Sequence, residues 1–364
     1  MKGSVVAACL AIVLALSTVG ADSPFEDAVP GRVLDFPADH GKHPAFQTEW
    51  WYFTGNLQSD EDRPWGFQLT FFRRGFFAKS PRPDSAWSVR DVYPAHFALA
   101  DIQTRTFFHT ELLSREGPGL AGSATGDLDV HVRNWSAQRS GDRVLLKARE
   151  GDYALDLTLT PQKPVVLHGK SGFSRKGDSP GQASFYYSFT RMAAQGSIVF
   201  KGVERKVNGL AWMDHEFGSS LLIGDQAGWD WFSLQLDDGT ELMVFHLRKK
   251  DGAFEQPFGT FVPQEGPSVG LSDRQIAISA TRQWTSPHTK ATYPSEWTIE
   301  VPDQNLKLRV TPLMPDQELA TARSTRIVYW EGAVTATGSR NGRDVRGTGY
   351  AELTGYAHSM GGKL

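Results

Sequence analysis

The stretches WWYFTGNL, Trp50–Leu57, and GFQLTFFR, Gly66–Arg73, decide the fold class of this 364-residue chain. Both are rich in large aromatic side chains. In the second stretch, apolar residues alternate with Gln68 and Thr70. A period of two residues places apolar side chains on one face of an extended chain, which is typical of a β-strand. We therefore predict a β-strand in each stretch.

Similar runs recur along the chain, and only His109–Glu116 has a pattern that suggests a short helix. The further predicted strands are Phe97–Gln103, Leu128–Trp135, Arg143–Ala148, Tyr153–Thr160, Phe185–Thr190, Gly196–Lys201, Gly209–Met213, Trp229–Leu236, Glu241–Leu247, Gln275–Ala280, Glu296–Val301, Leu306–Thr311, Ile327–Thr335 and Gly347–Thr354. The prediction is an all-β protein. Two antiparallel barrels suit so many short strands better than one open sheet, because closure removes exposed edges.

Turn residues support the antiparallel arrangement. Asp237-Asp238-Gly239 and Asn341-Gly342 each separate two apolar runs and can adopt the positive φ angles of tight hairpins. The glycine-bounded segment 218–228 is a plausible passage between two domains.

The N-terminus has the pattern of a secretory signal peptide. Lys2 precedes an almost wholly apolar run from Val5 to Val19, and Val19-Gly20-Ala21 resembles a cleavage site. We predict that residues 1–21 are removed and that the protein is exported, in a bacterial setting to the periplasm. The apolar run is too short for a spanning helix and no second one follows, so we expect no transmembrane segment. Cys9 lies too early in the run for lipidation.

The charge balance argues against nucleic acid as a partner. The chain has 38 Lys and Arg against 41 Asp and Glu, a net charge of −3. No positive field is available to attract phosphates.

The first candidate site is the segment FPADHGKHPAFQTEWWYFTGNL, residues 36–57. Its chemically active residues are Asp39, His40, His43, Glu49, Trp50, Trp51 and Tyr52. The histidines and carboxylates could ligate a metal and the aromatic triplet could line an apolar cavity. Alternatively, the segment is a polar loop that leads into a half-buried strand. The spacing matches no known ligand set, so we predict no metal.

The second candidate site combines GLAWMDHEFG, Gly209–Gly218, with Trp229-Asp230-Trp231. In a strand, the two tryptophans share one face and Asp230 lies on the other. If Asp230 faces a barrel interior, burial would raise its pKa and make it a proton donor, with Asp214 and His215 supplying or orienting a base. Alternatively, Asp230 faces solvent and the tryptophans belong to the core.

Two further motifs, YWEG at Tyr329–Gly332 and GYAELTGY at Gly349–Tyr356, are interpreted as closing strands with a core role. We expect no cofactor: residues 117–122 have the glycine spacing of a dinucleotide-binding motif, but this segment contains Pro118. A hydrolase is less favoured, because Pro180 in GDSPG stands where an oxyanion-binding N–H would be needed.

These motifs resemble the AttH-like/CrtC family, which includes carotenoid 1,2-hydratases and predicted secreted hydrolases. The resemblance rests on DHGKHPAFQTEWWYFTG (39–55), WMDHEFG (212–218), the triplet at 229–231 and the two closing motifs. It implies two consecutive lipocalin-like β-barrels, at residues 36–218 and 223–364. It also implies binding of an apolar, isoprenoid- or lipid-like ligand.

For the hydratase branch, the resemblance implies acid-catalysed addition of water to an isolated C=C bond, without a cofactor. Asp230 would donate the proton, and Asp214 or His215 would hold the water. The implied ligand-binding side chains are Trp50, Trp51, Tyr52, Trp212, Phe217, Trp229 and Trp231, with Asp39, His40, His43 and Glu49 at the junction of the barrels. Phe217 stands where the hydratase pattern has a tryptophan.

The alternative function is a periplasmic carrier of lipids or other ligands without catalysis, such as an accessory protein of an ABC transporter. Lipocalin-like barrels occur in binding proteins and in enzymes, so the fold alone does not separate the two functions.

Overall fold

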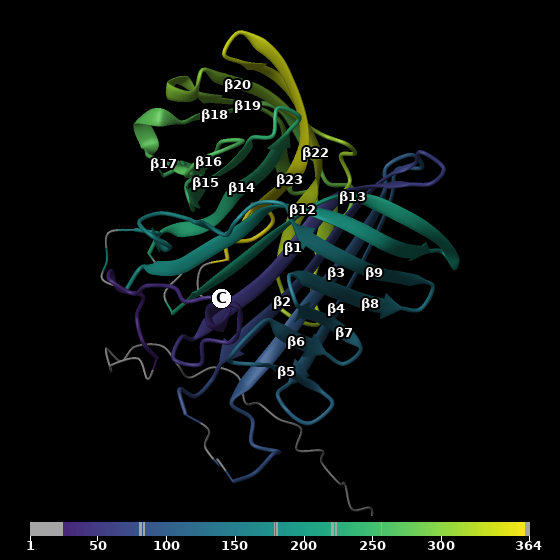
Figure 1. The fold of residues 1–364 in the computed structure, drawn as a ribbon, viewed down its shortest axis with the longest axis vertical. Helices are drawn as coiled ribbons and strands as arrows, with labels where there is room; N and C mark the ends of the chain where they lie inside the picture. The colour runs from purple at the N-terminus through teal and green to yellow at the C-terminus, as the bar shows by residue number, and fades with distance from the viewer. Residues whose placement is uncertain are drawn as a thin grey trace, which may run out of the picture.

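The computed structural model describes residues 25–79, 82, 84–177, 179, 181–219, 222, 224–255 and 257–360. These residues form two antiparallel β-sheets that pack against each other, with the first half of the chain in one sheet and the second half in the other (Figure 1). The predicted signal peptide lies outside the described residues.

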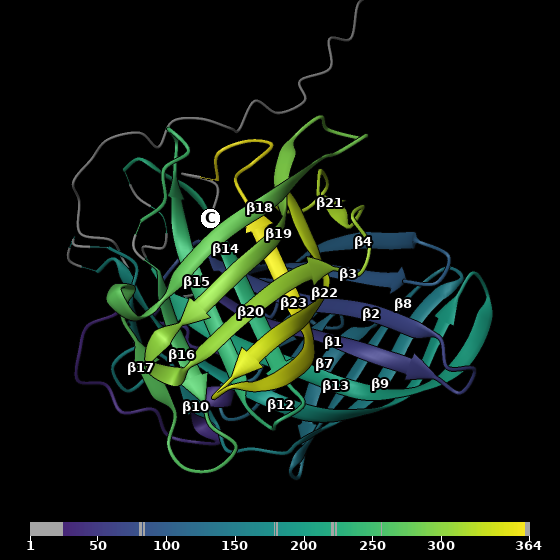
Figure 2. The same ribbon diagram turned by 90° about the horizontal axis from the view of Figure 1, so that it is seen from above.

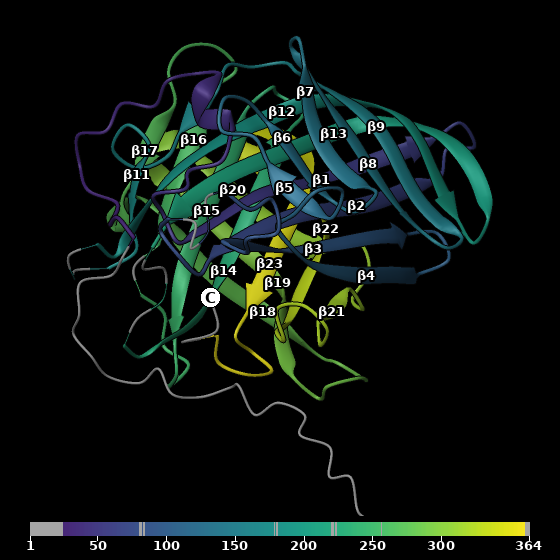
Figure 3. The ribbon, with the colours of Figure 1, turned by 90° about the horizontal axis from the view of Figure 1, so that it is seen from below.

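The first sheet has thirteen strands in the order β4-β3-β2-β1-β13-β12-β9-β8-β7-β6-β5, and β10 and β11 also pair with β12. Its strands are β1 (Thr48–Ser59), β2 (Pro64–Gly75), β3 (Asp91–Asp101), β4 (Thr106–Arg115), β5 (Ala121–Ser123), β6 (Asp129–Val132), β7 (Trp135–Ser140), β8 (Arg143–Glu150), β9 (Tyr153–Pro161), β10 (Val166–Leu167), β11 (Phe173–Arg175), β12 (Ala183–Phe200) and β13 (Val203–Gly218). The sheet curls until β3 and β4 contact β6, so it forms a nearly closed barrel (Figure 3). A 3-10 helix, η1 (Ala38–His40), precedes it.

The second sheet has ten strands in the order β17-β16-β15-β14-β23-β22-β20-β19-β18, and β21 pairs with β22. Its elements are β14 (Gln226–Leu236), β15 (Glu241–Lys249), β16 (Phe258–Val262), β17 (Val269–Leu271), η2 (Asp273–Gln275), β18 (Ala277–Thr285), β19 (Thr292–Val301), η3 (Pro302–Gln304), β20 (Leu306–Pro312), β21 (Glu318–Ala320), β22 (Val328–Arg340) and β23 (Arg343–Thr354). This sheet forms a half-barrel (Figure 2).

The all-β prediction is confirmed, and so are both hairpins. Gly239 at the β14–β15 turn has φ +78°, and Asn341 and Gly342 between β22 and β23 have φ +50° and +75°. The helix predicted at His109–Glu116 is wrong, because residues 109–115 belong to β4 and pair with β3. The predicted strands Phe185–Thr190 and Gly196–Lys201 are one long strand, β12, with an irregularity between Phe189 and Met192.

The strand β1, the second half of β13 (residues 211–218) and the first part of β12 (residues 183–190) are buried on both faces. One face carries Trp51, Phe53, Met213 and Phe217 into the barrel interior. The other face is covered by the second sheet, and there β1 contacts β23, β2 contacts β22, and β12 contacts β14. Burial on both faces explains the nearly continuous aromatic sequence of β1. Among the residues that the structure describes, no helix is long and apolar enough to cross a membrane.

Candidate functional site

A pocket lies between the two sheets and is open to solvent at its mouth. We call it the inter-sheet pocket. Its lining residues are Trp50, Tyr52, Thr70, Phe72, Lys176, Tyr186, Asp214, Glu216, Leu222, Trp229, Trp231, Phe245, Leu247, Ile327, Tyr329, Glu331, Glu352 and Met360. A mostly apolar wall with a few convergent polar groups is typical of a small-molecule site.

Strand register brings the pocket residues of the first sheet together. Across β1 and β13, Trp50 is opposite Glu216 and Tyr52 is opposite Asp214. Because residues directly opposite each other share a face, all four side chains point out of the barrel towards the second sheet. The predicted ligand residues Trp50 and Tyr52 therefore do lie at the pocket with Asp214.

Asp214 is the acid of the pocket that accepts three side-chain hydrogen bonds. Its Oδ2 accepts a hydrogen bond from the Tyr186 hydroxyl at 2.7 Å, and its Oδ1 accepts from Trp212 Nε1 at 2.6 Å and from the Ser188 hydroxyl. Burial raises the pKa of Asp214 from 3.8 to about 7, although the three hydrogen bonds favour the charged form and lower it. This carboxyl group can therefore be protonated or ionised near neutral pH.

Three more acids line the pocket. Glu216 accepts hydrogen bonds from Lys176 Nζ at 2.8 Å and from the Ser184 hydroxyl. Glu352 accepts from Trp229 Nε1 at 2.8 Å, and burial raises the pKa of Glu352 to about 7.

Glu331 lies opposite Glu352 in the β22–β23 register. Burial raises its pKa well above the usual value, and the charge of Glu352 adds to the effect.

Asp230 does not line the pocket. It is 1% exposed and lies opposite Leu353, so it faces the interior of the half-barrel, while Trp229 and Trp231 point the other way into the pocket. Its two carboxyl oxygens accept hydrogen bonds from the Tyr356 hydroxyl at 2.9 and 3.0 Å. The structure thus separates the predicted proton donor from the aromatic pair that was to surround it, and Asp230 does not face solvent either.

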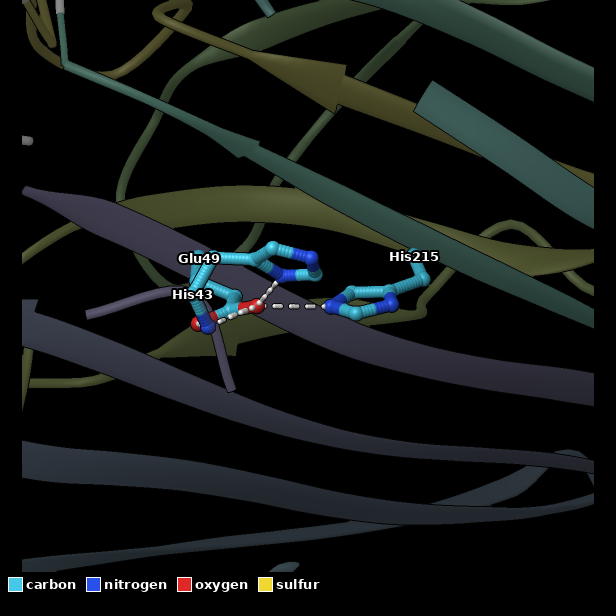
Figure 4. Close-up of side chains that lie close together, drawn as sticks. All are labelled: His43, Glu49 and His215. Carbon is cyan, nitrogen blue, oxygen red and sulfur yellow. Dashed lines mark hydrogen bonds and ion pairs between the residues drawn. The ribbon is translucent and has the colours of Figure 1, made fainter. Parts of the chain in front are cut away.

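The first sequence cluster forms a second polar centre inside the barrel. This barrel cluster consists of Asp39, His40, His43, Glu49, Arg73, Asp91, Tyr187 and His215. Glu49 lies at its centre: one carboxyl oxygen is 2.7 Å from His43 Nδ1 and 2.9 Å from His215 Nε2 (Figure 4). The other carboxyl oxygen accepts a hydrogen bond from Arg73 Nε at 2.9 Å. Burial alone would raise the pKa of Glu49, but the charges of His43 and Arg73 hold it well below its usual value.

The partners fix the protonation of the histidines. Both ring nitrogens of His43 meet carboxylates, Glu49 and Asp39, so both donate; the carboxylates raise the pKa of His43 although burial opposes them. His215 donates to Glu49 and accepts from the Tyr187 hydroxyl, because burial lowers its pKa and favours the neutral ring. Tyr187 in turn accepts from His40 Nδ1 at 2.7 Å.

The ligand atoms of His43, Glu49 and His215 lie within 4.8 Å of one another, which is close enough to hold a metal ion. Three observations disfavour this. His43 Nδ1 and His215 Nε2 already donate hydrogen bonds to Glu49. Arg73 and the protonated His43 supply the positive charge that this carboxylate needs. All three residues are also buried. A cation would have to displace these protons and lie beside two existing charges.

Two of the remaining predicted ligand residues lie in the barrel, and the third lies between the sheets. Trp51 stacks on His215, with ring centroids 4.9 Å apart, and donates its indole N–H to the His40 carbonyl. Phe217 stacks on His43 at 3.4 Å between centroids. Trp212 lies directly behind the pocket wall, against Trp231. The first two residues support the barrel cluster and do not line the inter-sheet pocket.

Sequence reasoning missed Glu331 and Glu352, which lie in the two motifs interpreted as closing core strands. A signal was present: a glutamate stands in an otherwise apolar or aromatic run, YWEGAV and YAELT. Carboxylates are rarely buried without a functional or structural partner, so such a residue in a strand buried on both faces is a candidate site residue.

The fold and site together define a class of protein: two packed antiparallel sheets that hold an aromatic pocket with buried acids between them. The chain belongs to the AttH-like family, whose sequence profile matches residues 27–356. This confirms the resemblance inferred from the motifs. No curated protein sequence matches the chain.

Solved structures share the architecture. A putative AttH protein from Nitrosomonas europaea is 37% identical, with a TM-score of 0.82 over 91% of this chain and 100% of that one. Kievitone hydratase from Nectria haematococca is 15% identical, with a TM-score of 0.69 over 92% of this chain and 98% of that one. CghA is 13% identical, with a TM-score of 0.55 over 94% and 96% of the two chains. The last two show a common fold.

Proposed function

We propose that this protein binds an apolar, isoprenoid- or lipid-like molecule in the inter-sheet pocket and adds water to one of its C=C bonds, with Asp214 as the proton donor. The observation that carries the proposal is the Asp214 carboxyl group, buried at an aromatic wall with its pKa raised to about 7. General acids work best when their pKa lies near the working pH. The fold shared with kievitone hydratase supports a hydro-lyase activity.

The reaction balances without a redox partner. Protonated Asp214 transfers its proton to one alkene carbon, and the π electrons form the new C–H bond. The other carbon becomes a carbocation, which the faces of Trp229 and Trp231 stabilise. A water oxygen then forms the C–O bond, and the proton that it loses returns to the Asp214 carboxylate. The net change is addition of H and OH across the double bond.

The assignment to Asp214 revises the expectation from sequence. Asp230 lies on the opposite face of β14, and His215 lies on the opposite face of β13 with both nitrogens occupied in the barrel cluster. Neither side chain lines the pocket. Asp214, expected to hold the water, is the predicted catalytic residue that reaches it.

A pair of Asp→Asn variants tests the proposal. The mature protein is incubated with a host isoprenoid and lipid extract, and mass spectrometry records retained molecules and products heavier by one water. Asp214→Asn should lower hydration about 10²–10⁴-fold, which is the usual contribution of a general acid. Asp230→Asn, an equally buried aspartate on the other face, should keep activity within about tenfold of wild type.

Each outcome separates the candidate functions. Full activity in Asp214→Asn, or loss only in Asp230→Asn, would refute the assignment. A molecule retained unchanged by the wild type would favour the carrier function, including a role beside an ABC transporter. Export to the periplasm remains part of the proposal, and N-terminal sequencing of protein from fractionated cells tests it by locating the cleavage after residue 21.

A further inference from the structure

Glu331 is the most unusual buried group at the inter-sheet pocket. Its side chain is 2% exposed, lines the pocket, and has no hydrogen-bond partner for either carboxyl oxygen among the described residues. The hydroxyl of Tyr52 also has no partner in that part of the chain. Burial raises the pKa of Tyr52 and the charge of the neighbouring Glu331 adds to the effect, but the two groups do not form a well-aligned hydrogen bond.

The other three acids of the pocket differ from Glu331. Asp214 accepts three hydrogen bonds, Glu216 is paired with Lys176, and Glu352 accepts from Trp229. The fold therefore supplies partners to these acids from neighbouring strands. An unpartnered buried polar group is costly, and one that faces a cavity is available to a ligand.

The chemistry of Glu331 indicates what this ligand group is. Burial and the neighbouring Glu352 raise its pKa well above the usual range and favour the protonated carboxyl group, which both donates and accepts hydrogen bonds. The Tyr52 hydroxyl has the same dual capacity. An alcohol or phenol is the complement of such a pair, because it also donates once and accepts.

We propose that Glu331 and Tyr52 form a subsite that binds a hydroxyl group of an otherwise apolar ligand. The inference rests on the proposed function, since it assumes that the inter-sheet pocket takes such a ligand. Tyr52 lies directly opposite Asp214 in the β1–β13 register, so the ligand hydroxyl is held one side chain away from the acid. The substrate class is thus a hydroxylated isoprenoid or similar molecule, and not a plain hydrocarbon.

Two isoprenoid probes, one with a hydroxyl group and one with a further C=C bond in its place, test the subsite. Farnesol and farnesene have the same carbon number, and their binding is followed by the fluorescence of Trp50, Trp229 and Trp231, which line the pocket. The full mature chain should bind farnesol at least about tenfold more tightly than farnesene, because a site built to bond a hydroxyl rejects the analogue that lacks it. Glu331→Met should reduce this preference to about one by weakening farnesol binding alone.

Matched variants separate the subsite from the pocket as a whole. Glu331→Gln keeps one donor and one acceptor and should retain most of the preference. Tyr52→Phe removes only a hydroxyl group and should weaken farnesol binding about three- to tenfold. This variant keeps a test available if Glu331→Met does not fold. Leu247→Ala, on the apolar wall, should weaken both probes equally.

The outcomes distinguish the two proposals. If wild type binds both probes equally, or Glu331→Met leaves the preference unchanged, the hydroxyl subsite is overturned while the apolar pocket stands. If neither probe binds up to its solubility limit, the proposed ligand class of the pocket is overturned together with the subsite.

Discussion

The barrel cluster and the inter-sheet pocket are both buried and rich in ionisable groups, but they differ in how those groups are paired. In the barrel cluster, Glu49 meets His43, His215 and Arg73, and its pKa is lowered. In the pocket, burial raises the pKa of Asp214, and Glu331 has no partner among the described residues. Complete pairing is the property of a structural centre, whereas raised pKa values and missing partners mark a site for a ligand.

The largest expected effect is on the barrel cluster. Glu49→Gln keeps the side-chain shape but removes the charge that Arg73 and His43 need, so it should lower the free energy of unfolding by about 3–5 kcal/mol. Chemical denaturation measures this change. The matched control is Asp156→Asn, whose ion pair with Lys147 at 3.7 Å has both partners more than half exposed and should change stability by less than about 0.5 kcal/mol.

The same measurement tests the absence of a metal from the barrel cluster. We expect a chelator to leave the unfolding midpoint of the wild type unchanged. A drop that is restored by one divalent ion, together with a small effect of Glu49→Gln in chelator, would mean that His43, Glu49 and His215 hold a metal instead of forming the paired cluster described above.

The second prediction has the opposite sign. Glu331→Met should raise the free energy of unfolding by about 1–3 kcal/mol, because it removes a buried carboxyl group that lacks partners. Glu318→Met is the contrasting control. Glu318 is 5% exposed but accepts hydrogen bonds from Ser286, Thr289 and Tyr293, so its replacement should destabilise the protein. Denaturation of both variants decides the point, and destabilisation by Glu331→Met would show that its carboxyl group is paired.

The third prediction concerns pH. Since burial raises the pKa of Asp214 from 3.8 to about 7, the folded protein retains a proton that the unfolded chain releases, and stability from this group falls as pH rises from about 4 to about 7. Hydration should fall about tenfold per unit above pH 7, because the protonated donor is lost. A pH profile of kcat/KM measures the midpoint.

Ser188→Ala sharpens this prediction. It removes one hydrogen bond to the Asp214 carboxylate, which favours the protonated form and should move the midpoint up by about one pH unit, or about 1.4 kcal/mol. Trp212→Phe removes another donor to the same oxygen and should act in the same direction. A downward shift in either variant would contradict the assignment of the titration to Asp214.

The sequence by itself determined the fold class, the hairpins and the family. The alternation in Gly66–Arg73 predicts a strand because a period of two is a local property of the extended chain. The turns at Gly239 and at Asn341-Gly342 follow from residues that tolerate positive φ. The resemblance to the AttH-like/CrtC family can be recognised from the sequence because each motif is a short, continuous run of residues. The one predicted helix failed because pairing of β4 with β3 outweighs a weak local pattern.

Only the tertiary structure decided which face of each strand serves the site. Alternation shows that Asp230 and its flanking tryptophans lie on opposite faces, but in a strand buried on both sides it does not show which face adjoins a cavity. The packing of the second sheet against β1, β2 and β12 places Asp214 at the pocket, while His215, on the opposite face of β13, lies in the barrel. Glu331 became a candidate for the same reason: its missing partners are a property of contacts between strands far apart in the chain.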